Sequence, residues 1–255
     1  MLEATLRRDR MVVAGGILGL AALAWAYVAR MAGPASGGMA MTMPDMARAA
    51  GPGLGWLFGM WAVMMVAMML PSAAPTILLF AGLSRRRRLQ GRPAVPAAIF
   101  TLGYLLVWTL YAAIAATAQW ELRRRAVLSP AMASASPLLA GGLLVAAGIY
   151  QFMPLKGACL SQCRSPLGFF SAEWREGAGG ALMMGIRHGS FCVGCCWLLM
   201  ALLFVAGVMN LLWVAAIAVF VLLEKLVPGG DRLGRLAGVG LVAWGAWLIG
   251  GFGGA

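Results

Sequence analysis

The residues best suited to bind a metal ion are five cysteines and a single histidine, all in the second half of the 255-residue chain. His188 is followed closely by Cys192, Cys195 and Cys196. On an α-helix, which turns by about 100° per residue, these four side chains share one arc of about 100°. Thiolate sulfur and imidazole nitrogen are soft or borderline ligands, so this spacing predicts a site for a thiophilic metal on one helix face.

A second pair of cysteines, Cys159 and Cys163, precedes this group. Pro154 and Pro166 flank the pair and predict a compact loop. The loop is expected on the same side of the membrane as the first group, so the two groups could form one site. Basic residues next to both groups favour the thiolate form, which is the form that binds metal.

Methionines form two further sets of candidate ligands. Four lie in a segment rich in Gly and Pro, and two are spaced four residues apart in an apolar run: Met39, Met41, Met43 and Met46, then Met64 and Met68. Thioethers bind Cu(I) and are poor ligands for Zn²⁺, so the sets predict capture and relay of a soft ion. The alternative is that methionines only fill gaps between helices.

The composition shows which elements must position these ligands. The chain is 62% hydrophobic and 11% charged, with a mean hydropathy of +0.86, and this balance excludes a soluble domain. The predicted fold is all-α, a polytopic bundle of about seven transmembrane helices. The expected spans are Met11–Ala29, Leu54–Leu83, Val95–Ala118, Pro137–Met153, Ala181–Val208, Leu211–Leu226 and Leu233–Phe252. We divide the chain into a signal-anchor helix (1–30), a Met-rich outer loop (31–53) and a six-helix metal-binding domain (54–255).

The distribution of charge predicts the orientation. With the N-terminus inside, fifteen of the 20 Lys and Arg residues fall on the cytoplasmic side and five, including Arg123–Arg125, on the other. Lys and Arg are enriched in the cytoplasmic loops of membrane proteins, which accounts for the net charge of +12 without nucleic-acid binding. The lipid bilayer is the expected partner. The uninterrupted apolar run of the fifth span begins at Phe191, which places Cys192–Cys196 near the cytoplasmic surface.

Two details of the helices can be predicted. Pro71 and Pro75 fall inside the second span, which is too long for a straight crossing, so we expect a bent and partly re-entrant helix. Glu224 and Lys225 end the sixth span, where they are expected to snorkel to the membrane surface or to pair with each other.

Three ordered motifs resemble those of a bacterial family of integral membrane proteins. They are Trp61-x-x-Met64-Met65-x-Ala67-Met68-Met69-x-Pro71, Tyr150-Gln151-x-x-Pro154-Leu155-Lys156-x-x-Cys159-x-x-x-Cys163-Arg164-x-Pro166 and Gly189-x-x-Cys192-x-Gly194-Cys195-Cys196-Trp197. That family contains a domain of unknown function, is described as metal-binding and is sometimes labelled a copper chaperone. The resemblance implies metal handling, and we expect a multi-pass protein of the bacterial inner membrane.

The sequence therefore predicts a protein that binds a soft metal ion, Cu(I) before zinc, for transport or for delivery to a periplasmic or membrane metalloprotein. No phosphate-binding G-x-x-x-x-G-K-[ST] loop is present, and no enzymatic activity is expected. Two alternatives remain open. The pair Cys192 and Cys195 has the spacing of a thiol–disulfide electron carrier, and the cysteines could also be packing residues of a structural subunit.

Overall fold

A computed structural model describes residues 2–32, 53–91, 93–125, 128 and 136–251, and the regular elements within these ranges are helices. They are α1 (Leu2–Ala32), α4 (Leu54–Leu89), α5 (Ala97–Arg124), α6 (Pro137–Tyr150), α7 (Pro154–Arg164), α8 (Pro166–Glu173), α9 (Gly177–Ala201), α10 (Leu203–Ala206), α11 (Leu211–Leu226) and α12 (Gly230–Gly251). The predicted all-α membrane bundle is confirmed. The Met-rich segment that contains Met39, Met41, Met43 and Met46 lies outside the described residues.

Five helices of the described chain are long and apolar enough to cross a membrane. The predicted fourth span is shorter, because α6 has 14 residues and α7 begins at Pro154 after a bend of 67°. This pair forms a sixth candidate as a broken span or a re-entrant loop. The predicted sixth span, α11, has 16 residues, since Asn210 caps its start and Pro228 follows soon after its end.

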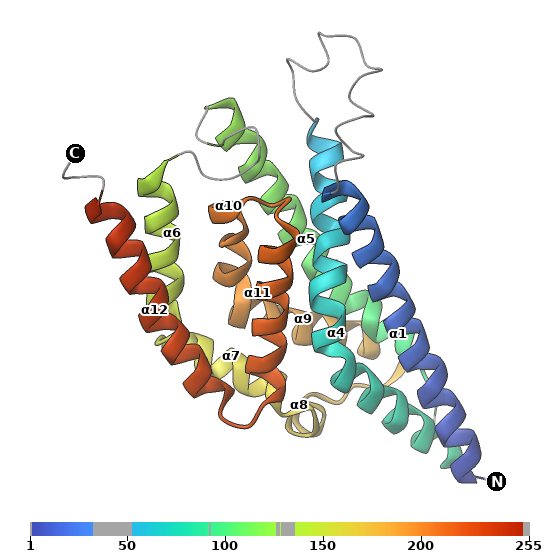
Figure 1. Ribbon diagram of the computed structural model, residues 1–255. Coiled ribbons are helices and arrows are strands. Elements are labelled where there is room, and N and C mark those ends of the chain that lie inside the picture. The colour runs from blue at the N-terminus through green and yellow to red at the C-terminus, as the bar shows by residue number, and fades with distance from the viewer. Residues whose placement is uncertain (1, 33–52, 92, 126–127, 129–135, 252–255) are drawn as a thin grey trace.

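The long helices run alternately between the two ends of the bundle (Figure 1). The α1 helix begins at the end where α7 and α8 lie, and α12 ends at the opposite end. The arginine run Arg85–Arg88, at the close of α4, lies at the same end as α7. This arrangement fits the alternation that the charge distribution predicts.

The two prolines lie inside α4, and the predicted bend of this helix is confirmed. The helix is continuous over 36 residues and changes direction along its length, whereas the break falls between α6 and α7. Pro71 has no N–H to offer the carbonyl of Ala67, four residues earlier. That oxygen instead accepts a hydrogen bond of 3.0 Å from Trp25 Nε1 of α1, so the proline links two helices.

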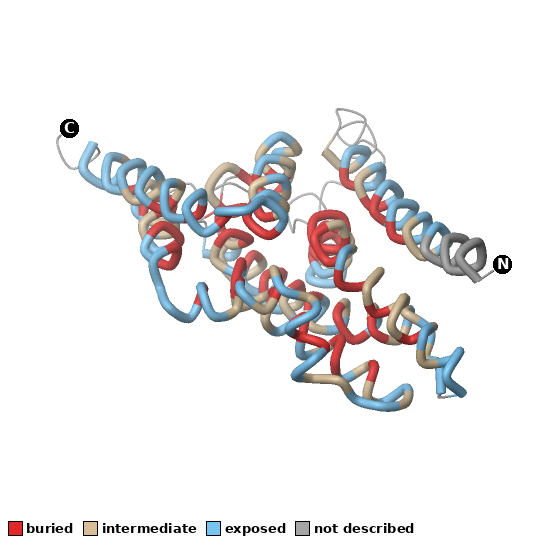
Figure 2. Tube along the Cα trace, turned by 90° about the horizontal axis from the view of Figure 1, so that it is seen from below, coloured by how far each residue is buried: buried red, intermediate tan, exposed pale blue. Residues whose placement is uncertain are grey.

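Buried residues gather in the central helices, while α1 and α12 at the flanks show mostly exposed side chains (Figure 2). Two close helix contacts depend on glycine. A Cβ atom on Gly103 of α5 or on Gly185 of α9 would collide with the backbone of the other helix. Gly238 of α12 and Gly148 of α6 are in equally close contact. Small residues let helix backbones approach closely in a membrane, and the α5–α9 contact sets the position of the site described next.

Candidate metal site

The α9 helix buries the whole predicted ligand group, with 2% or less of each side chain exposed: His188, Cys192, Cys195 and Cys196. The helix begins at Gly177, well before the apolar run at Phe191, so Cys192 lies about 22 Å along the helix rather than near its start. The predicted fifth span begins at Ala181, so the helix extends four residues further toward the predicted cytoplasmic end.

Cys192 is the centre of the contacts between helices. Its Sγ lies 3.1 Å from the hydroxyl of Tyr104 on α5, and that hydroxyl also lies 3.1 Å from the carbonyl oxygen of Met69 on α4. Cys196 Sγ is 4.0 Å from Met69 Sδ. Three helices thus bring a thiol, a thioether and a phenol together in a space closed to solvent.

A lysine from α11 completes the surroundings of Cys192. The Lys225 ammonium lies 3.0 Å from Cys192 Sγ and 2.9 Å from the hydroxyl of Ser72. Only 6% of Lys225 is exposed. An ammonium group at this distance compensates the negative charge that a thiolate would carry in an apolar interior.

The prediction that Glu224 and Lys225 snorkel to the surface or pair with each other is wrong. Glu224 is 1% exposed and forms an ion pair of 2.5 Å with Lys156 of α7, which also donates to Gln151. The reason lies in tertiary packing, since α7 and α12 cover this end of α11 and Gly234 lies directly against the Glu224 carboxylate. Lys225 is therefore free of its neighbour and faces the cysteines.

The second cysteine pair lies on a helix and not in a loop. Proline suits the first position of a helix, and Pro154 and Pro166 begin α7 and α8 in this way. Cys163 of α7 is buried in the same core cluster as Cys192 and Cys195, and α7 packs against α9. The two cysteine groups therefore meet, as the sequence suggested, although the connecting structure differs.

Cys159 of α7 contacts Gly194 of α9, next to the buried cysteines. It is half-buried, and its Sγ lies 2.6 Å from the position that a Cβ atom on Gly194 would occupy. The Tyr150 hydroxyl donates to the Gly194 carbonyl oxygen and supports this contact. Glycine at position 194 thus lets α7 lie on α9 beside the cysteines.

The methionines of α4 are placed differently from one another. Met64 and Met68 are buried, with 1% and 2% exposed, but Met69 is the one whose sulfur approaches a cysteine. The spacing of four residues therefore predicted two buried methionines correctly. The thioether that lies closest to a cysteine belongs to Met69, which is next to Met68 in the chain. The outer Met loop cannot be placed, because it is not among the described residues.

His188 is enclosed by aromatic rings of α5 and α8. Its ring centroid lies 5.2 Å from that of Phe169 and 5.9 Å from that of Tyr104. Within the described chain, its buried Nδ1 atom has no hydrogen-bond partner. A buried nitrogen without a partner is costly, which suits a donor that a ligand satisfies.

The donor set suits a soft ion more than a hard one. Across the described ranges, no group of three or more His, Cys, Asp or Glu side chains is arranged to hold a metal ion. Sulfur atoms nevertheless gather here, since the Cys195 and Cys196 thiols both donate to the Cys192 carbonyl oxygen and Cys196 Sγ lies 4.0 Å from Met69 Sδ. Thiolate and thioether ligands suit a soft ion such as Cu(I). Two thiolates and one Cu⁺ ion would carry a net charge of −1, which the Lys225 ammonium balances.

Sequence reasoning missed three contributors to this cluster: Tyr104, Lys225 and Met69. For Lys225 a signal was present, because an ionisable residue within an apolar span is a functional candidate by default. Tyr104 carried no comparable signal. Its role depends on the close α5–α9 contact, which the periodicity of one helix does not encode.

Comparison with known proteins gives one match. The model of a family with the description "PpoB2: Copper chaperone" matches residues 58–248, which include α7, α9 and nearly all of α4. No similar curated protein and no similar solved structure was found.

Proposed function

Because this chain belongs to the PpoB2 copper-chaperone family, we propose that it holds Cu(I) within the membrane and passes it to a partner metalloprotein. The observation that carries this proposal is the contact of the Lys225 ammonium with Cys192 and of the Met69 thioether with Cys196, within the core that also buries Cys163 and Cys195. A thiol-rich, charge-balanced cluster suits a monovalent soft ion. His188 and Met69 are the additional donors that we assign to the site.

The proposed route of the ion combines the sequence pattern of the Met-rich segment with the buried sulfur atoms of α4 and α9. In this proposal the outer Met39–Met46 loop captures Cu(I), and the buried methionines of α4, Met64 and Met68, conduct it toward the cysteines. We place the α7 end of the bundle in the cytoplasm of a bacterial cell and the protein in its inner membrane, as the charge distribution favours. Thioethers resist oxidation to disulfides, which suits ligands on the outer face.

The burial of the thiols argues against the alternative of a thiol–disulfide carrier. Exchange requires that a sulfur atom of the partner contact the thiolate directly, and Cys192 and Cys195 are each 1% exposed. In our proposal, by contrast, the ion itself moves along the buried methionines of α4. The thiols of Cys195 and Cys196 both donate to the Cys192 carbonyl oxygen, at 3.1 Å and 2.9 Å. An exchanger would also leave His188 and the methionines without a role.

The test is metal analysis of the purified protein under reducing conditions. The double variant Cys192→Ser/Cys195→Ser is expected to lower bound copper at least about tenfold, since loss of even outer-shell partners costs about 10–100-fold in affinity. Ser190→Ala, on the exposed face of the same helix, is the matched control and should retain copper. Unchanged copper in the double variant would place the site elsewhere, and zinc in place of copper would replace the ion.

A further inference from the structure

A closed ring of polar contacts includes the Cys192 sulfur. The Lys225 ammonium, 3.0 Å from that sulfur, also donates to the Ser72 hydroxyl at 2.9 Å. Ser72 in turn donates to the Met69 carbonyl oxygen at 2.9 Å. The Tyr104 hydroxyl donates to the same oxygen and lies 3.1 Å from Cys192 Sγ, which closes the ring. The ring therefore joins residues of four helices: α4, α5, α9 and α11.

Every member of this ring is buried. Ser72 is the most exposed of the five at 7%, and Tyr104 is fully enclosed. A buried polar network in which each member has a partner is rigid and specifies one arrangement of its side chains. The ring therefore fixes the Cys192 sulfur and the Lys225 ammonium relative to each other before an ion binds.

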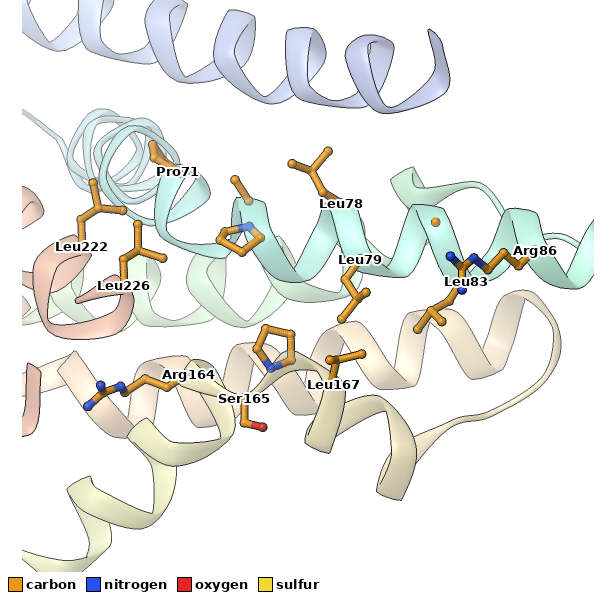
Figure 3. Close-up of a pocket in the computed structure, with 14 residues that line it drawn as sticks. Pro71, Leu78, Leu79, Leu83, Arg86, Arg164, Ser165, Leu167, Leu222 and Leu226 are labelled. Atoms are coloured by element: carbon orange, nitrogen blue, oxygen red, sulfur yellow. The ribbon is translucent and has the colours of Figure 1, made fainter. Parts of the chain in front are cut away.

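The part of the ring that belongs to α4 lies at a proline kink, since Pro71 falls between Met69 and Ser72. Pro71, Leu222 and Leu226 lie toward one end of an apolar groove of about 1020 Å³ between α4 and α11 (Figure 3). The five ring residues, all within the described ranges, do not line this groove. Because the groove separates the two helices on its own side, the bond from the α11 lysine to the α4 serine connects them on the other side.

We propose that Ser72 and Tyr104 are positioning residues of the copper site. Ser72 acts through Lys225, because it holds the ammonium beside the sulfur on which the charge of a copper complex would lie. Tyr104 acts through Cys192 and Met69, because its hydroxyl contacts the sulfur of one and the backbone of the other. Partners that hold metal ligands in this way contribute about 10–100-fold to affinity. The inference rests on the proposed function and adds two residues that supply no metal ligand themselves.

The experiment is a double-mutant cycle, measured by titration of the full-length protein with Cu(I) against a competing chelator. Ser72→Ala and Tyr104→Phe should each weaken binding about tenfold, at the lower end of the range for such partners. In a Lys225→Met background, Ser72→Ala should have almost no further effect, because the ammonium that it positions is gone. A merely structural loss would lower the affinity by the same factor in both backgrounds. Ser72→Thr restores a hydroxyl and should retain most of the affinity.

Two matched controls remove the same groups elsewhere on the same helices. Ser84 of α4 is buried, and its hydroxyl donates to the Val95 carbonyl oxygen. The Tyr111 hydroxyl of α5 donates to the Trp197 carbonyl oxygen of α9. Ser84→Ala and Tyr111→Phe should therefore bind Cu(I) like the wild type. Thermal unfolding verifies that each variant folds.

Three results would overturn the proposal. They are normal affinity in both Ser72→Ala and Tyr104→Phe, an undiminished effect of Ser72→Ala in the Lys225→Met background, and equal losses in the two controls. If Tyr104→Phe does not fold, the cycle between Ser72 and Lys225 decides alone. A wild type that binds no copper would refute the proposed function itself, whereas a wild type that binds copper with any of the three results would refute this inference only.

Discussion

Replacing Lys225 by methionine tests whether its charge forms part of the copper site. The ammonium lies 3.0 Å from Cys192 Sγ with both residues buried. A hydrogen bond to a charged group contributes about 1.5–3 kcal/mol net, which corresponds to about 10- to 150-fold in affinity. The negative charge of a copper complex is shared between two sulfurs, so the lower part of this range applies. We expect Lys225→Met to weaken Cu(I) binding about 10- to 30-fold.

The assay is a titration of purified protein against a competing Cu(I) chelator under reducing conditions. Lys225→Arg preserves the positive charge and should retain most of the affinity, and thermal unfolding verifies that both variants fold. Zinc gives a second readout, because Zn²⁺ with two thiolates is already neutral and gains from the loss of the lysine. The ratio of zinc to copper affinity should therefore rise in Lys225→Met. Unchanged or tighter Cu(I) binding in Lys225→Met would refute the charge-balance argument.

Four further predictions address the histidine, the buried ion pair, the α5–α9 contact and the orientation. His188→Ala should weaken Cu(I) binding by about 1–2 kcal/mol in the same titration, because it removes a buried donor that has no other partner in the described chain; unchanged affinity would leave the histidine a packing residue. Glu224→Gln should lower the free energy of unfolding by about 3–5 kcal/mol, since it leaves the buried Lys156 ammonium without its carboxylate, and a near-normal melting temperature would contradict this. Gly185→Leu should prevent the α5–α9 contact and abolish copper binding, and retained copper would contradict this. In a background with all native cysteines replaced by serine, an impermeant thiol reagent applied to whole cells should label Thr42→Cys but not Gln90→Cys, and the reverse pattern would invert the proposed orientation.

The face of α9 could be predicted from the sequence because it depends on one helix. A rotation of about 100° per residue is enough to place Cys192, Cys195 and Cys196 together, and the structure buries all three. The all-helical fold followed from composition for a similar reason, since lipid offers the backbone no hydrogen-bond partner.

The neighbours of those cysteines depend on contacts between distant segments, and periodicity does not encode them. Lys225 is 33 residues from Cys192 in the chain, and Tyr104 is 88 residues away. The same limitation explains the wrong expectation for Glu224, whose partner Lys156 lies on a helix that the flanking prolines led us to predict as a loop. Proline is common both at the first position of a helix and in loops, so its presence alone does not distinguish the two.

The buried ion pair between Lys156 and Glu224 also constrains how the protein is assembled. The two charges are 68 residues apart, and neither can enter the bilayer interior cheaply without the other. While the ribosome is still synthesising the intervening helices, α7 therefore has to wait at the membrane surface. It can settle against α9 only once α11 has been inserted. We therefore expect the thiol cluster to close late in biogenesis, and a chain truncated before α11 to leave Cys163 exposed instead of enclosing it.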